Sequence, residues 1–253
     1  MKNLIKNKLS QIEVNKNIKI LYACESGSRL YGLENEKSDY DVRFIYLQST
    51  ENYLSVVPSH EVIEIKDEEN KLDIVGWDIR KTLRLLTKPN INLIEWLYSD
   101  QIYYELIDNT QKDLCGFAED FYSSNRFISH YMGVLKSEQS KKITVKRKLT
   151  IFHRLLSCFW VQKFDTIPPV KIQDLLPIVE EGAGRYIKDE LLLLIDNKNN
   201  IDIPKCPLID RITHKLEQMI NIPNKIKITQ AQLKNRYRKV DRWLFKLIKD
   251  VKI

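Results

Sequence analysis

The chain has few glycines, and its cysteines do not cluster. It contains only seven glycines among 253 residues, which argues against a large β-sandwich, because such folds need many tight turns. The four cysteines lie far apart and include no Cys-x-x-Cys pair, so the local patterns of a zinc knuckle and of a thioredoxin-like motif are absent. We therefore expect four reduced thiols, as is usual in a cytoplasmic protein. They are Cys24, Cys115, Cys158 and Cys206.

Long apolar segments are also missing. No stretch longer than nine residues lacks a charged side chain, whereas a membrane-spanning helix needs about 20 apolar residues. The first ten residues carry lysines throughout and lack the apolar segment of a signal peptide. We expect a protein with no membrane partner that stays in the cytoplasm. With 43% hydrophobic residues, the chain can still bury a sizeable core.

The net charge of +7 is unevenly distributed. Residues 225–253 contain ten Lys or Arg and two Asp, a balance of +8, so residues 1–224 sum to −1. A second basic stretch, Lys136 to Arg154, has seven cations and one acid, Glu138. Two basic segments on a nearly neutral body indicate a polyanionic partner. The alternative is a solvated helix face in a lysine-rich protein.

The first hundred residues alternate between helix and strand patterns. Residues 3–16 predict an amphipathic helix, and short helices are expected at 29–33, 78–86 and 91–98. Apolar or β-branched runs predict strands at 18–23 and 41–47, and a hairpin at 62–65 and 72–75.

Beyond residue 100 almost every pattern is helical. The expected helices are 103–115, 116–135, 143–163, 186–196, 207–221 and 229–250. We therefore predict an α+β fold in which a small mixed-sheet domain, residues 1–100, precedes an all-α domain, residues 101–253, that ends in a basic helix.

Three short motifs stand in order within the first domain. Gly27-Ser28 follows the first predicted strand, where backbone N–H groups and a glycine allow a phosphate to approach closely. Asp39 and Asp41 begin the next strand and point to the same face, because side chains alternate along a strand. Asp73 is a lone acid in an apolar strand, where burial is costly without a partner or a role.

Together the motifs indicate metal-dependent chemistry on phosphates. Neighbouring carboxylates repel each other unless they share a cation, and Mg²⁺ is commonly held by one or two carboxylates together with substrate phosphates. If the strands of Asp41 and Asp73 lie side by side, the site has three carboxylates and suits phosphoryl or nucleotidyl transfer with two metal ions. The alternatives are structural: Asp39 as a turn cap, Asp41 on a solvent-facing strand, and Asp73 paired with Arg80 or Lys81.

The motifs and their spacing resemble the DNA polymerase β-like nucleotidyltransferase superfamily. Three longer strings, Glu25–Gly32, Ser38–Phe44 and Asp73–Lys81, resemble more narrowly the RNA repair pathway DNA polymerase β family of predicted nucleotidyltransferases. The specific match covers about residues 20–98, and a looser one reaches Pro168-Pro169.

The resemblance implies a role for each matching residue. Gly27 and Ser28 would hold phosphates of an NTP, and the three acids Asp39, Asp41 and Asp73 would bind two Mg²⁺ ions, Asp73 as the third carboxylate. Asp78 competes for that third role, but it stands where a helix begins and where carboxylates commonly cap.

Four cations are weaker candidates for binding the triphosphate. Arg43 shares its strand face with the acids, which makes it a phosphate ligand or a charge partner of those acids. Arg29 lies next to the phosphate motif, and Lys148 and Arg154 come from the second domain.

The leading hypothesis is a Mg²⁺-dependent nucleotidyltransferase whose acceptor is RNA, such as tRNA or an RNA 3′ end, because both basic segments favour a polyanion. The alternatives are transfer to a protein side chain, transfer to a small molecule such as an antibiotic, and a non-catalytic nucleic-acid-binding module on the same fold.

Overall fold

A computed structural model of the protein describes most of the chain, and its contacts divide the chain into two compact units. The described residues are 1–57, 59–88, 90–139, 144–179, 184–199, 206–221 and 229–251. The sheet unit comprises Met1–Gly27, Asp39–Phe121 and Lys227–Ile253, and the helical unit comprises Ser28–Ser38 and Tyr122–Ile226. Five cations of the two basic segments, Lys141, Lys142, Lys225, Lys227 and Lys252, lie outside the described residues.

These units divide the chain at other places than residue 100, where the sequence analysis puts the domain boundary. The sheet unit continues to Phe121 and takes in the last helix, whereas residues 28–38 join the helical unit. Both differences come from contacts between residues far apart in the chain, which a local pattern does not encode.

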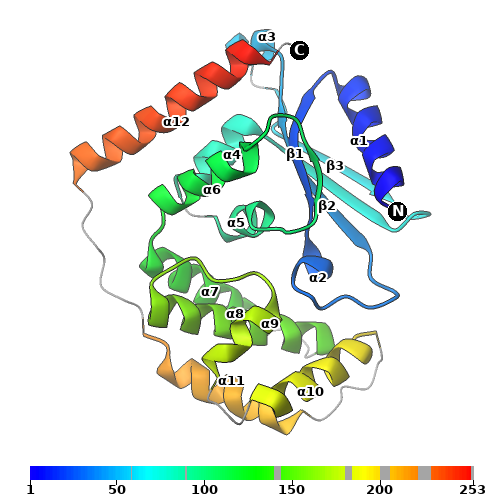
Figure 1. The fold of residues 1–253 in the computed structure, drawn as a ribbon, viewed down its shortest axis with the longest axis vertical. Helices are drawn as coiled ribbons and strands as arrows, with labels where there is room; N and C mark the ends of the chain where they lie inside the picture. Colours follow the sequence, from blue (N-terminus) through cyan, green and yellow to red (C-terminus); the bar gives the residue numbers. More distant parts are fainter. Residues whose placement is uncertain are drawn as a thin grey trace. The chain divides into compact units, whose positions relative to one another are not determined.

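The sheet unit is built on a five-stranded mixed sheet in the order β3-β4-β2-β1-β5 (Figure 1). The strands are β1 Lys19–Glu25, β2 Tyr40–Leu47, β3 Val62–Asp67, β4 Leu72–Asp78 and β5 Ile102–Glu105. Strands β2 and β4 run parallel, and the other neighbouring pairs are antiparallel. With its many helices, this mixed sheet gives the chain the predicted α+β fold.

Helix α1, Lys2–Lys16, covers one face of the sheet. Its residues Ile5, Leu9 and Ile12 are buried and pack in one cluster with inward side chains of β2 such as Val42 and Phe44. The spacing of the three helix residues places them on one stripe, as expected for a helix lying on a sheet.

The opposite face of the sheet carries helices α4 Ile79–Leu86, α5 Ile91–Leu97 and α6 Thr110–Asp120 (Figure 1). The rings of Trp77 on β4 and Trp96 on α5 lie with their centroids 3.9 Å apart. Tyr22 of β1 donates a hydrogen bond to the Trp96 carbonyl at 2.9 Å. A short helix, α3 Thr50–Leu54, follows β2.

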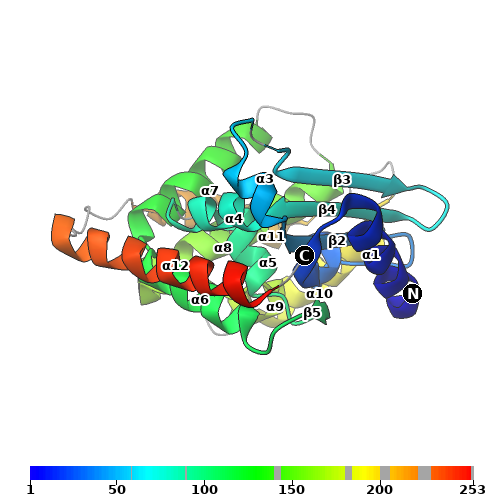
Figure 2. The same cartoon turned by 90° about the horizontal axis from the view of Figure 1, so that it is seen from above.

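The C-terminal helix α12, Gln230–Asp250, packs along α6 in the sheet unit (Figures 1 and 2). Trp243 donates from Nε1 to Asp113 Oδ2 at 2.8 Å and meets the Phe117 ring edge-on. A capping box at Thr229 and Gln232 fixes the start of the helix.

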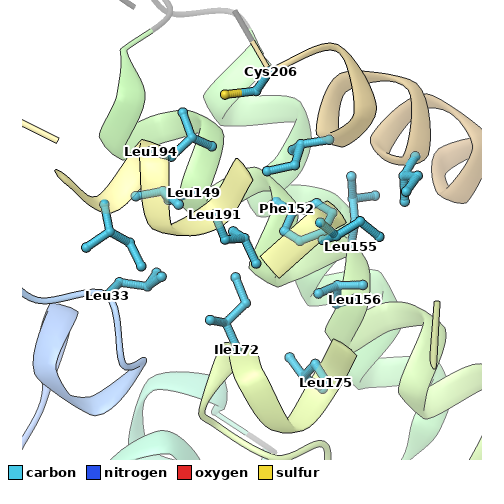
Figure 3. Packing of buried hydrophobic residues seen from close by; sticks show 14 of the residues in the cluster. Leu33, Leu149, Phe152, Leu155, Leu156, Ile172, Leu175, Leu191, Leu194 and Cys206 are labelled. Atoms are coloured by element: carbon cyan, nitrogen blue, oxygen red, sulfur yellow. The ribbon is translucent and has the colours of Figure 1, made fainter. Parts of the chain in front are cut away.

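The helical unit has a core of its own (Figure 3). Its helices are α7 Ser124–Gln139, α8 Val145–Phe164, α9 Ile172–Leu175, the 3₁₀ helix η1 Leu176–Ile178, α10 Gly184–Asp196 and α11 Pro207–Met219. Buried residues of α8, such as Phe152 and Leu155, lie at the centre of this core, and Leu33 of the 28–38 segment joins it. The contact of Leu33 explains why that segment belongs to the helices.

Most predicted elements are confirmed, including the antiparallel hairpin of β3 and β4. The prediction of helix over 103–115 is wrong in its first part, and with it the all-α character of residues 101–253. Residues Ile102–Glu105 form strand β5, which pairs with β1, and helix α6 begins only at Thr110. The β-forming side chains of Ile102, Tyr103 and Tyr104 become a strand because the edge of β1 is available to pair with them.

All four cysteines are free thiols, as the sequence predicts. Burial raises the pKa of the Cys24 thiol to about 12, so this group next to the predicted phosphate motif is protonated at neutral pH and is no nucleophile. In the described part of the chain, no helix combines the length and the apolar character that crossing a bilayer requires.

Candidate active site

The parallel pairing of β2 and β4 brings two of the predicted acids together. Asp41 lies directly opposite Asp73 in the register of the two strands. Side chains at paired positions point to the same face of a sheet, so both carboxylates lie on one face. The sequence did not determine whether these two strands are neighbours, and the structure shows that they are.

The guanidinium group of Arg43 joins the two carboxylates. Its Nη2 lies 2.9 Å from Asp41 Oδ1 and 2.9 Å from Asp73 Oδ2. Its Nη1 donates to the carbonyls of Val42 at 3.0 Å and Asp73 at 2.7 Å, which fixes the plane of the group. Arg43 is therefore a charge partner of the acids in the structure, and its positive charge offsets their repulsion.

Gly27 lies against the carboxylate of Asp41. A Cβ atom built on Gly27 would come 1.9 Å from Asp41 Oδ2 and 2.5 Å from Asp41 Cγ, and the backbone there has φ of +62°. Both features require glycine, because other residues rarely adopt this left-handed region and no side-chain atom fits in the space. The glycine of the predicted phosphate motif thus also allows Asp41 its position.

Glu25 is a site residue that the sequence analysis did not single out. Its side chain is fully buried. Oε1 accepts a hydrogen bond from the backbone N–H of Asp41 at 3.0 Å, and Oε2 accepts one from the Tyr103 hydroxyl. The neighbouring Ser26 N–H donates to the Asp41 carbonyl at 2.8 Å. The sequence did contain a signal for this role: Glu25 is a charged residue at the end of an apolar run, and a carboxylate buried there needs hydrogen-bond partners.

Replacing Glu25 by Ala is expected to destabilise the sheet unit by about 3 kcal/mol or more. The change leaves the Asp41 N–H and the Tyr103 hydroxyl without their acceptor, and each unsatisfied buried group costs about 1–3 kcal/mol. Urea unfolding measures the effect, with Tyr103→Phe as the milder comparison because it removes one hydrogen bond. Equal stability of Glu25→Ala and wild type would contradict this reading.

Asp78 has a structural role. It is buried and caps α4, where its Oδ1 accepts from the Arg80 N–H at 2.8 Å. Its Oδ2 accepts from the Tyr53 hydroxyl at 2.7 Å and from Gln48 Nε2 at 3.1 Å. These bonds confirm that Asp78 caps the helix, whereas Asp73 has an exposed fraction of 37% in its side chain and lies next to Asp41.

Three further predicted site residues, Asp39, Ser28 and Arg29, lie in or next to the motifs in the sequence. Asp39 is exposed and precedes β2. Ser28 is the second residue of helix α2, Gly27–Leu30. Arg29 donates from Nη2 to the carbonyl of Ser38 at 3.0 Å. Roles of Asp39, Ser28 and Arg29 in binding metal or phosphate stay predictions.

Lys148 and Arg154, both on α8, have partners inside the helical unit. Lys148 Nζ lies 2.9 Å from both carboxylate oxygens of Asp210. Arg154 is buried, with its guanidinium 5.4 Å from the ring centroids of Tyr31 and of Tyr131. Cation–π contacts of this kind hold an arginine in a fixed orientation. Binding of nucleotide by either residue stays a prediction.

Asp41 and Asp73 fit a divalent cation. Their two carboxylates converge on one cationic atom, Arg43 Nη2, and carboxylate oxygens are the ligands that Mg²⁺ prefers. Among the described residues, no three Asp, Glu, His or Cys side chains come close enough to form a metal-binding group. The structure therefore shows two converging acids, and the participation of Asp39 stays a prediction.

Comparison with known proteins identifies the family. The family model described as "RNA repair pathway DNA polymerase beta family" matches residues 1–246, nearly the whole chain. The chain belongs to this family. The resemblance that the three motifs carry is thereby confirmed, and the match extends through the helical unit and most of α12.

Two relatives and one solved structure are similar to the chain. An uncharacterised protein of Bacillus subtilis (strain 168), YcgL, is 34% identical over 260 residues that cover 99% of this chain and 98% of the relative. An uncharacterised protein of Methanocaldococcus jannaschii, MJ0002, is 31% identical over 121 residues, which cover 47% of this chain and 48% of the relative. A nucleotidyltransferase-like protein from Exiguobacterium sibiricum 255-15 superposes with a TM-score of 0.34 at 12% identity, covering 100% of this chain and 81% of the other.

The family and the arrangement of the sheet acids point to a nucleotidyltransferase, and thus to an enzyme. Such enzymes usually take an NTP and a divalent metal ion.

Proposed function

We propose that the protein transfers a nucleoside monophosphate from an NTP to a hydroxyl group of RNA, with Mg²⁺. The observation that carries this proposal is that the carboxylates of Asp41 and Asp73 converge on one atom, Arg43 Nη2, while Asp41 also lies against Gly27. Family membership supports the reaction class, and the basic segments support a polyanionic acceptor.

In the proposed reaction, the acceptor hydroxyl oxygen attacks the α-phosphorus of the NTP. The bond between the α-phosphorus and the bridging oxygen to the β-phosphate breaks, pyrophosphate leaves, and the hydroxyl proton goes to a base. Asp73 is proposed as that base, because its side chain is more exposed than that of Asp41, at 37% against 25%.

Asp39, Asp41 and Asp73 would hold two Mg²⁺ ions, which lower the pKa of the attacking hydroxyl and offset charge on the leaving pyrophosphate. Gly27 and Ser28 are proposed to bind the β- and γ-phosphates through backbone N–H groups. Arg43 contacts both sheet acids and is proposed to hold their carboxylates in position for the substrate. Arg29, Lys148 and Arg154 are proposed as further contacts to the triphosphate.

The test incubates the purified protein with each NTP, labelled at the α-phosphate, together with Mg²⁺ and total RNA from the native host. We expect label to enter RNA with wild-type protein and not with the double variant Asp39→Asn, Asp41→Asn, nor after chelation of the metal. The gel also reports the preferred NTP.

Other results of this test would replace the proposal. Label in a protein band that vanishes in the double variant would show transfer to a protein side chain. Label in neither RNA nor protein, with RNA still bound by both variants, would contradict transfer to RNA. Small-molecule acceptors would then be tested before a purely binding role is accepted.

A further inference from the structure

Helix α12 has one side that packs and one that does not. Val240 and Leu247 are its buried residues. At its flanks, Lys239 pairs with Asp120 at 2.7 Å, and the ring of Tyr237 lies 5.4 Å from that of Phe121. These contacts orient the helix about its axis and determine which residues face away from the sheet unit.

The side opposite Val240 and Leu247 carries a row of four cations and one phenylalanine. At 3.6 residues per turn, these five positions fall within an arc of about 80°, with Arg238 about 180° from Leu247. All five side chains are exposed. The row, here called the outer row, consists of Lys234, Arg238, Arg242, Phe245 and Lys249.

The cations of the outer row have no acidic partner among the described residues. Within the described residues, none of the four forms an ion pair, in contrast to Lys239 on the flank of the helix. Within the part of the chain that the structure describes, the hydrogen bond of the Arg242 guanidinium group is the one from Nε to the Arg238 carbonyl at 3.3 Å, which leaves its two Nη groups for an external anion. A row of unpaired positive charge attracts phosphates.

Phe245 is 70% exposed and stands between Arg242 and Lys249 in this row. The other large apolar residues of α12 lie on the packed side or at its flanks, so Phe245 is displaced from the stripe that folding uses. An exposed aromatic ring among cations is the combination that binds single-stranded nucleic acid, because the ring stacks on a base while the cations contact the backbone.

From these contacts we infer that the outer row of α12 binds the single-stranded segment of an RNA acceptor, with one unpaired base stacked on Phe245. The inference rests on the proposed RNA acceptor. Lys234 and Lys249 are 15 residues apart in the sequence, so the row extends about 22 Å along the helix, enough for several nucleotides. A duplex hides its base faces in the stack and would meet only the cations. A membrane surface would need a broad apolar side, which α12 has already packed against α6.

The test measures binding of a fluorescent single-stranded RNA oligonucleotide and of a blunt RNA duplex by anisotropy, without NTP or metal, over a range of salt concentrations. Phe245→Ala should weaken single-strand binding on the order of tenfold and leave duplex binding unchanged. Phe245→Trp, which keeps an aromatic ring at this position, should bind the single strand like wild type. The triple change Arg238→Gln, Arg242→Gln, Lys249→Gln should reduce the slope of log affinity against log salt by about 2 for the single strand.

Two matched controls separate the outer row from surface composition in general. Tyr186→Ala removes an aromatic ring that is 65% exposed on α10. The triple change Lys2→Gln, Lys6→Gln, Lys16→Gln removes the same charge from exposed positions of α1. Both controls should bind like wild type. The inference would be overturned if Phe245→Ala bound the single strand as tightly as wild type. It would also be overturned if the two triple variants lowered the single-strand affinity equally.

Further outcomes distinguish this inference from the proposed function. RNA labelling with wild-type efficiency in the outer-row variants would overturn the inference and leave the transferase proposal in place. Single-strand binding that depends on Phe245, without any transfer, would support the inference and contradict the transferase. Phosphatidylserine vesicles are the third ligand: if Phe245→Ala abolishes binding to them but not to RNA, the outer row is a membrane contact and the inference is wrong.

Discussion

An Asp73→Asn variant is expected to release pyrophosphate from NTP at least about 100-fold more slowly than wild type. Loss of groups that only support metal ligands already costs about 10–100-fold, and Asp73 is proposed to contact the metal and to accept the hydroxyl proton. Stability should change by less than about 1 kcal/mol, because the side chain is 37% exposed and its ion pair with Arg43 is partly solvated. A coupled pyrophosphate assay and urea unfolding measure the two quantities.

The control for this prediction lies on the same strand. Asp78→Asn should lower the free energy of unfolding by about 1–3 kcal/mol, because it weakens the helix cap and the bonds to Tyr53 and Gln48. Its activity per folded molecule should stay near wild type. Glu64→Gln, an exposed acid on β3, should change neither quantity. A folded Asp78→Asn variant without activity, beside an active Asp73→Asn variant, would reverse the assignment of the third carboxylate.

A Gly27→Ala variant is expected to lose most activity and some stability. The left-handed backbone costs a residue with a Cβ about 1–2 kcal/mol. The new methyl group would stand 1.9 Å from Asp41 Oδ2, so the Asp41 side chain must rotate away from Arg43 and Asp73. We expect at least a tenfold lower rate of pyrophosphate release, because small displacements of reacting groups have large effects on rate.

Gly133→Ala is the matched comparison for that change. Gly133 lies inside α7, and a Cβ atom there meets nothing within 4 Å. Alanine should therefore stabilise the protein by about 0.5–1 kcal/mol through its higher helix propensity, and activity should not change. A Gly27→Ala protein as active as Gly133→Ala would show that the position of Asp41 does not matter for the reaction.

Much of the fold could be predicted from the sequence, because its local patterns are strong. The apolar spacing of residues 3–16 specifies α1, and β-forming runs specify β1, β2 and the hairpin. Strand β5 could not be found in this way, because Ile102–Glu105 becomes a strand only by pairing with β1, some 80 residues earlier in the chain.

The same distinction holds for the candidate site. Side chains alternate along β2, so the sequence alone predicts that Asp41 and Arg43 share one face. That Asp73 joins them could not be predicted, because it depends on β4 lying next to β2 in the sheet. The contact of Glu25 with Tyr103 could not be predicted, because Tyr103 lies on the unforeseen strand. Arg43 is a charge partner of the acids, which was one of its two predicted roles, whereas the predicted pairing of Asp73 with Arg80 or Lys81 is wrong because Asp73 pairs with Arg43.

The place of α12 in the sheet unit has a consequence for how the protein is made. Residues 122–226 are synthesised after α6 and before α12, the helix that packs on α6. At about 5–20 residues per second, this interval lasts roughly 5–20 s on the ribosome. During that time Phe117 and Phe121 lack the rings of Trp243 and Tyr237. A product that ends before α12 would keep this aromatic surface exposed, even though it contains every residue proposed to act on the NTP.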